Sequence, residues 1–239
     1  MFARFGSQVT LLEAGETFAP ALDSDIATRV RGMLEGEGIT VVTGAQVTSF
    51  DDAGDHVDIV TGDRTFAADA VLVAAGRRPA TEDLNLAAAG VATDERGYII
   101  VDDQLRTNVE GVYAVGDVNG GPQFTYVSPD DNRVLWDTLH DGPRRRDDRV
   151  GVPATTFLDP PLSEVGMTMR QARESGRSVL VATKDVAAIA AMPRPKIVGQ
   201  TEGVIRVFVD ADDHTILGAT LWCIDSQELV NLSLIHISE

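Results

Sequence analysis

The run Thr107-Asn108-Val109-Glu110-Gly111-Val112-Tyr113-Ala114-Val115-Gly116-Asp117 joins a short apolar segment to a Gly-Asp pair. The residues from Val112 to Val115 predict a strand that is buried on both faces, as strands of parallel sheets are. Gly116 would let a ligand approach the backbone, and Asp117 would lie at the carboxyl end of the strand, where open α/β sheets bind ligands. A carboxylate in that place can accept hydrogen bonds from sugar or ribityl hydroxyl groups.

A helix is predicted to follow the pair, from about Ser128 to Leu139, after the turn residues Asn119 to Pro122. The positive end of that helix would point toward whatever Asp117 holds and would favour negative charge there. Taken alone, a Gly-Asp pair is more often an ordinary turn after a buried strand. The spacing of the neighbouring residues favours the binding interpretation.

That spacing, Thr-x5-Tyr-Ala-x-Gly-Asp with Gly76-Arg77-Arg78-Pro79 upstream, resembles the second flavin-binding motif of the pyridine nucleotide–disulfide oxidoreductases. This family includes the glutathione, dihydrolipoamide and mercuric reductases. The resemblance implies that Asp117 binds the ribityl chain of FAD, with Gly116 beside it, and that Gly76 lies against the nucleotide. It also implies that Thr125, within the segment 123–127, contacts the flavin ring through its backbone amide; a plain lead-in to the helix is the alternative.

An acidic residue closes the first predicted strand, which runs from Val9 to Leu12 and is followed by Glu13. In a Rossmann unit a carboxylate in this position hydrogen-bonds the adenosine ribose of NAD. A solvated loop residue is the alternative, but the sequence around Glu13 resembles the NAD domain of the same family. NAD is therefore expected as a second cofactor in addition to FAD, and NADH is expected to be preferred over NADPH. The Gly-x-Gly-x-x-Gly turn that should precede this strand is expected upstream of Met1.

The fold class predicted is α/β. The resemblance implies an incomplete Rossmann-like NAD domain and the second part of an FAD domain, followed by an α+β dimerisation domain. The expected ranges are 1–79, 80–148 and 149–231. Helices are predicted at about 24–35, 84–89, 128–139 and 168–174 and from Ser226 onward. Strands are predicted at 9–12, 39–43, 47–50, 56–60, 64–67, 70–74, 98–101, 112–115, 153–157, 179–182, 204–209 and 217–224. The polar run 141–149 reads as a linker with a solvated arginine triplet.

Composition excludes several function classes. The net charge of −17 argues against an electrostatic nucleic-acid or anionic membrane surface. No apolar run approaches the roughly 18 residues that a bilayer crossing needs. A single cysteine, Cys223, fits a reducing compartment, so a cytoplasmic location is expected. No metal site is predicted.

Parts that carry chemistry in the family are not found in this sequence. The redox Cys-x4-Cys pair and the terminal His with its Glu are missing, so no catalytic residue is assigned, and Met1 resembles an internal methionine of the nucleotide-binding helix. Cys223 is expected to be a buried small hydrophobe.

Residues 232–239 resemble a translated sequencing adapter and are interpreted as non-native. His236 is therefore assigned no functional role. An ordinary apolar helix end is the alternative interpretation of these residues.

The parent protein is expected to be a homodimer that passes hydride from nicotinamide to flavin. Its acceptor, a disulfide, dithiol, metal ion or oxidant, is left open. Two alternatives remain: a non-catalytic nucleotide-binding or oligomerisation fragment, and a flavin reductase that lacks the disulfide.

Two segments resemble the reactive-chlorine-stress branch of the family, which lies near mercuric reductase. They are Phe-Thr-Tyr-Val-Ser-Pro-Asp-Asp at 124–131 and Val-Ala-Ala-Ile at 186–189.

Overall fold

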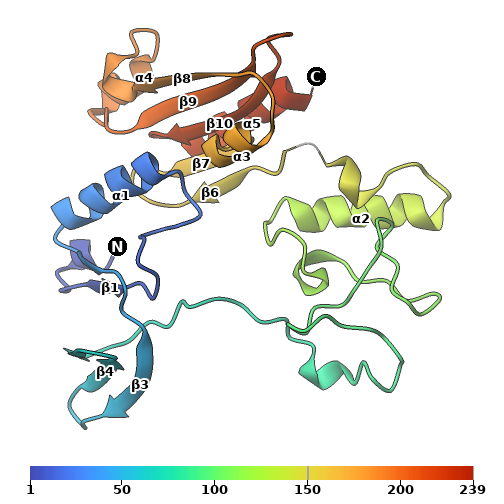
Figure 1. The fold of residues 1–239 in the computed structure, drawn as a ribbon, viewed down its shortest axis with the longest axis horizontal. Coiled ribbons are helices and arrows are strands. Elements are labelled where there is room, and N and C mark those ends of the chain that lie inside the picture. Colours follow the sequence, from blue (N-terminus) through green and yellow to red (C-terminus); the bar gives the residue numbers. More distant parts are fainter. Residues whose placement is uncertain (150, 239) are drawn as a thin grey trace. The chain divides into compact units, whose positions relative to one another are not determined.

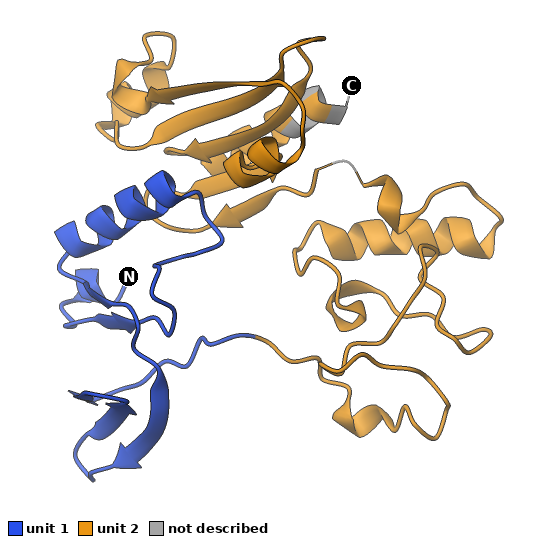
Figure 2. Cartoon of the chain, in the orientation of Figure 1, with its two compact units in different colours: residues 1–76 blue, residues 77–239 orange. Residues whose placement is uncertain are grey.

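The computed structural model describes residues 1–149 and 151–238 and divides into two compact units, Met1–Gly76 and Arg77–Glu239 (Figure 2). Within the described ranges no helix has the length and apolar character that crossing a membrane requires.

The first unit contains a parallel strand pair with a helical crossover, which is the unit of a Rossmann fold. Strand β1 (Thr10–Leu12) pairs with β2 (Thr40–Val42) in the register Thr10↔Thr40. Helix α1 (Ser24–Gly36) connects them and buries Ile26 and Val30, as its spacing predicts (Figure 1). A short 3-10 turn (Ala3–Phe5) precedes β1.

The predicted antiparallel meander is also confirmed. Strands β3 (Val47–Asp52), β4 (Val57–Thr61) and β5 (Thr65–Ala68) form a three-stranded sheet in sequence order. Ile59 is its buried apolar residue on the central strand. Each strand of a meander pairs with a neighbour close in sequence, so local alternation is enough to predict it.

The predicted buried strand at 70–74 is wrong. These residues are irregular and exposed, and the side chain of Leu72 is 80% accessible. The apolar pattern is real, but a strand forms only when a neighbour completes its hydrogen-bond ladder. Within the described residues of the first unit, the β1–β2 sheet does not extend to this segment.

The segment from 77 to 126 also has less regular structure than predicted. The predicted helix at 84–89 is a 3-10 turn (Glu82–Leu84) followed by further turns, and the predicted strands at 98–101 and 112–115 appear as the isolated bridges Thr93↔Ile99 and Arg106↔Tyr113. Side chains replace part of the missing ladder: Asn108 accepts from the Ala92 N–H and donates to the Gly90 carbonyl. Val91, Ile99 and Ala114 form a small core.

Helix α2 (Val127–Leu139) follows, within one residue of its predicted start. Its buried stripe contains Val127, Asp131, Val134 and Thr138, whose hydroxyl donates to the Gln104 carbonyl. The loop after it contains a 3-10 turn (Arg146–Asp148).

The last part of the second unit is the predicted α+β arrangement (Figure 1). Its antiparallel sheet has the order β6-β7-β10-β9-β8, from Ala154–Thr156, Leu162–Gly166, Ile216–Trp222, Val204–Asp210 and Val179–Asp185. Helix α5 (Ser226–Ser238) packs on β7 and β10, and Val165, Leu221, Cys223 and Val230 lie in the core. Helix α3 (Met169–Glu174) is capped by Thr168, and helix α4 (Pro193–Val198) follows a 3-10 turn (Val186–Ala188). Neither α4 nor the strand β7 was predicted.

The segment 232–239, expected to be non-native, continues α5 as far as Ser238, and Glu239 lies outside the described residues. Its origin therefore stays a prediction.

Candidate cofactor site

The Gly-Asp pair opens a tight turn rather than ending a strand. A 3-10 turn (Gly116–Asn119) begins at the pair, and Gly116 has φ +72°. A Cβ on Gly116 would lie 3.2 Å from the Ser128 hydroxyl oxygen, so both the backbone conformation and the space favour glycine. This turn brings the backbone of the motif against the first turn of α2.

Asp117 presents its carboxylate to solvent. The side chain is 58% exposed, and its nearest recorded cation is Arg77, whose guanidinium nitrogen lies 4.0 Å from a carboxylate oxygen. An exposed carboxylate with one distant charged neighbour keeps lone pairs for hydroxyl donors. The Asp117 carboxylate is therefore free to accept hydrogen bonds from a polar ligand.

The start of α2 offers backbone donors close to this turn. Tyr126 occupies the N-cap position, and no side-chain cap is recorded for it within the described part of the chain. Thr125 lies exposed in the turn immediately before it, and the Gln123 amide donates to the Tyr98 hydroxyl at 3.0 Å. The Val127 N–H donates to the Phe124 carbonyl and Pro129 has no N–H, so Ser128 is the remaining first-turn donor. The helix dipole favours an electron-rich group at this end.

A buried carboxylate that the sequence analysis missed holds the turn in place. Asp131 is 1% exposed, and its Oδ2 accepts from the Gly116 N–H at 2.6 Å and from the Asn119 side-chain amide at 3.0 Å. Its Oδ1 pairs with Arg149, whose Nε donates to Asp130 at 2.6 Å. The sequence does contain a signal for this role, because Asp131 falls on the apolar stripe of α2. A carboxylate that is buried there requires a hydrogen-bond or charge partner.

The arginines after α2 were predicted to lie solvated in a linker, but they form ion pairs. Arg144 lies 3.4 Å from Asp130, and Arg145 lies 3.9 Å from Asp103. The segment 141–149 is thus fastened to α2 and to the preceding loop.

In the first unit, Glu13 stands at the end of β1, as predicted. Its N–H donates to Val42, which extends the parallel ladder by one bond, and its Oε1 accepts from the Gly15 N–H at 2.8 Å. The second acid, Glu16, lies beside Gly44. The carboxylate is therefore held in a defined place at the carboxyl edge of the strand, where an adenosine ribose would bind.

Gly76 ends the first unit with φ +135°, a conformation that residues with a Cβ rarely adopt. Of the five predicted site residues, Gly116, Asp117 and Thr125 thus lie on one segment of the second unit, and Glu13 and Gly76 belong to the first.

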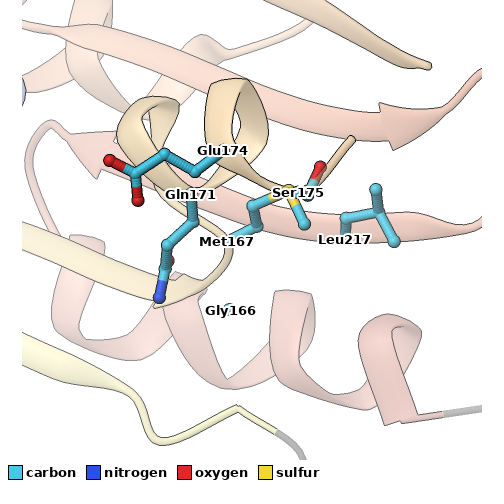
Figure 3. A pocket seen from close by; sticks show the side chains of 6 residues that line it. All are labelled: Gly166, Met167, Gln171, Glu174, Ser175 and Leu217. Carbon is cyan, nitrogen blue, oxygen red and sulfur yellow. The ribbon is translucent and has the colours of Figure 1, made fainter. Parts of the chain in front are cut away.

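Two other features of the chain do not form a cofactor or metal site. An open hollow of about 480 Å³ lies beside α3 and is lined by Gly166, Met167, Gln171, Glu174, Ser175 and Leu217 (Figure 3). It has one charged side chain and no convergent set of polar groups, unlike a typical cofactor pocket. Among the described residues, no group of three or more His, Cys, Asp or Glu side chains is placed to hold a metal ion.

Comparison with known proteins identifies the family. Residues 1–131 match the sequence model of the pyridine nucleotide-disulphide oxidoreductases. The chain belongs to this family. Residues 152–238 match the model of the family's dimerisation domain. Members of the family are FAD-dependent and use NAD(P)H, and the dimerisation domain joins two copies.

Individual relatives agree with this assignment. The chain is 45% identical to a probable pyridine nucleotide-disulfide oxidoreductase of Escherichia coli, RclA, over 97% of this chain and 52% of that protein. It is 35% identical to a mercuric reductase of Bacillus cereus, over 92% of this chain and 35% of the relative. The solved structure of the E. coli HOCl-induced flavoprotein disulfide reductase matches with a TM-score of 0.93 at 43% identity, over 99% of this chain and 54% of that one. The chain thus spans about half the length of the E. coli relative and about a third of the length of the B. cereus enzyme.

Proposed function

We propose that this chain is part of a cytoplasmic FAD-dependent NAD(P)H oxidoreductase. In that enzyme it supplies the second half of the FAD site, a contact with the nicotinamide dinucleotide, and a dimer interface. The observation that carries the proposal is the Gly116-Asp117 turn, fixed against α2 with its carboxylate exposed. Family membership supports it.

Each site residue then has a physical task. Asp117 accepts hydrogen bonds from the ribityl hydroxyls, and Gly116 keeps the backbone close to the cofactor. The Thr125 amide and the start of α2 face the electron-rich edge of the flavin, Gly76 lies against the nucleotide, and Glu13 accepts from the adenosine ribose of NAD. When bound, FAD supplies the hydride chemistry that links the nicotinamide to a disulfide, dithiol, metal ion or oxidant acceptor.

Cys223 has no part in that chemistry. It is fully buried, and desolvation, with the nearby Asp225 charge, raises its pKa to about 11. The nucleophilic thiolate is therefore disfavoured at neutral pH. We infer that the redox dithiol and the general acid/base come from parts of the parent protein outside this chain.

The test uses a fusion, called the completed protein below, of this chain with the portion of the E. coli relative that it does not match. NADH added without oxygen should bleach the visible flavin absorbance of the FAD-loaded completed protein. A spectrum that neither NADH nor NADPH changes would contradict the proposal.

A non-catalytic fragment is the second candidate, since the one thiol of the chain is buried. The match to the dimerisation domain argues against a flavin reductase that lacks the disulfide.

Glu13 is expected to make the completed protein prefer NADH. Its carboxylate accepts from the ribose hydroxyls and repels a 2′-phosphate, and no Lys or Arg occurs between Gly6 and Arg29. Glu13→Arg should shift the ratio of kcat/KM values toward NADPH by about 10- to 100-fold, since a charged hydrogen bond contributes about 1.5–3 kcal/mol.

The control is Glu35→Arg, the same charge change at an exposed position of α1, which should leave the ratio unchanged. An unmodified protein that already prefers NADPH would show that Glu13 is a solvated loop residue.

The chain is expected to self-associate through residues 151–231. Leu180, Val181 and Ile197 are exposed there, and such apolar surface is characteristic of an interface. Light scattering should report dimers or larger species for the full chain and a more monomeric species for residues 1–149, which keep Arg149 and its bonds to α2. A monodisperse monomer of the full chain would count against the interface assignment.

A further inference from the structure

Asp131 connects the two ends of the Gly116–Asn119 turn. One oxygen of its carboxylate receives the Gly116 N–H at 2.6 Å and the Asn119 side-chain amide at 3.0 Å. Asn119 in turn donates to the Ala114 carbonyl and accepts from the Gly121 N–H. The residues on both sides of Asp117 are therefore held by one side chain of α2.

The charge of Asp131 is balanced from the following loop. Arg149, whose side chain is 13% exposed, pairs with the other oxygen of Asp131 and with Asp130. Burial lowers the pKa of the Arg149 guanidinium, but its bonds to the two carboxylates outweigh this, so its pKa lies above the usual value. A buried carboxylate is stable only with such partners.

We propose that Asp131, neutralised by Arg149, is the positioning residue of the flavin-binding turn. It fixes the backbone at Gly116 and thereby the direction of the Asp117 carboxylate, and it ties that direction to the segment that leads into the dimerisation domain. This inference rests on the proposed function of Asp117. Asp131 itself needs no contact with the cofactor.

Asp130 provides a matched control within the same cluster. Both aspartates bond Arg149, and only Asp131 bonds the turn. Asp131→Asn removes the charge that receives the Gly116 N–H, whereas Asp130→Asn removes an equal charge next to it. Val134→Ala, at a fully buried position of α2, controls for general loosening of the helix.

The first measurement needs no cofactor and uses this chain. Amide hydrogen exchange at Gly116, followed by NMR, should accelerate at least about tenfold in Asp131→Asn, which corresponds to about 1.4 kcal/mol of lost protection. In Asp130→Asn the exchange rate at Gly116 should stay within about threefold of the rate in the unmodified chain, because the loss of protection there is smaller. Equal effects of the two substitutions, or no effect of either, would overturn the inference.

The second measurement is the Kd for FAD of the completed protein. Asp131→Asn should raise it at least about tenfold, while Asp130→Asn and Val134→Ala stay within about threefold. Faster exchange at Gly116 with an unchanged Kd would show that the turn is held but does not position the site, and would overturn the inference. If the unmodified completed protein binds no FAD, the proposed function fails, and with it the cofactor role given to Asp131, whatever the exchange at Gly116 shows.

Discussion

Replacing Asp117 by alanine should weaken FAD binding to the completed protein by about 100-fold or more. A ribityl chain offers several hydroxyl donors, and hydrogen bonds to a charged acceptor contribute about 1.5–3 kcal/mol each, so the loss of two bonds gives this factor. The side chain of Asp117 is 58% exposed, and among the described residues its carboxylate accepts no hydrogen bond from a backbone N–H, so its removal should leave the fold intact. Titration of the apoprotein with FAD, followed by flavin fluorescence, measures the change.

Glu110→Ala is the matched control, since Glu110 is an exposed acid of the same motif. It removes the same charge and should leave the affinity within about twofold, as distant exposed charges are screened. A similar loss of affinity in both variants would mean that net charge, and not a bond to the cofactor, explains the effect of Asp117.

The second large effect concerns turnover. The chain alone should show no NADH-dependent disulfide reduction above background, because its one thiol is buried with a raised pKa and no redox pair is present in the sequence. The completed protein should oxidise NADH when an acceptor such as a disulfide, a metal ion or an oxidant is supplied, since the fusion restores the dithiol and the first half of the flavin site. Reduction is followed as loss of NADH absorbance.

A control fusion that carries Asp117→Ala should lose most of that activity at limiting FAD and recover part of it when FAD is in excess. Turnover by the pure chain without the fusion would refute the view that the dithiol comes from elsewhere.

The sequence predicted most elements that a local pattern specifies. The α1 and α2 helices follow from the period of their apolar residues, and the meander and four of the five strands of the antiparallel sheet follow from alternation and turns. Strand β7, which pairs with β6 and β10, was not predicted. The strands expected at 70–74 and 112–115 have the right composition but remain irregular. Strands of parallel sheets depend on neighbours far away in sequence, and this chain spans about half the length of its relatives.

The site was predictable to a similar degree. Glu13 and Asp117 stand at positions that a motif specifies, so spacing finds them. Asp131 was missed although it lies four residues after Val127 and three before Val134, on the buried stripe of α2 and about 100° from Asp130, so the helical period could have found it. Arg149 was missed because it lies outside the helix, and only the packing of its loop against α2 brings it to Asp131.

The flavin content of the purified completed protein tests the central claim most directly. We expect one FAD for each chain, retained through purification and visible in the absorbance spectrum, and a clear loss of bound FAD in Asp117→Ala. A folded, dimeric completed protein that binds no flavin even when FAD is added in excess would contradict the account.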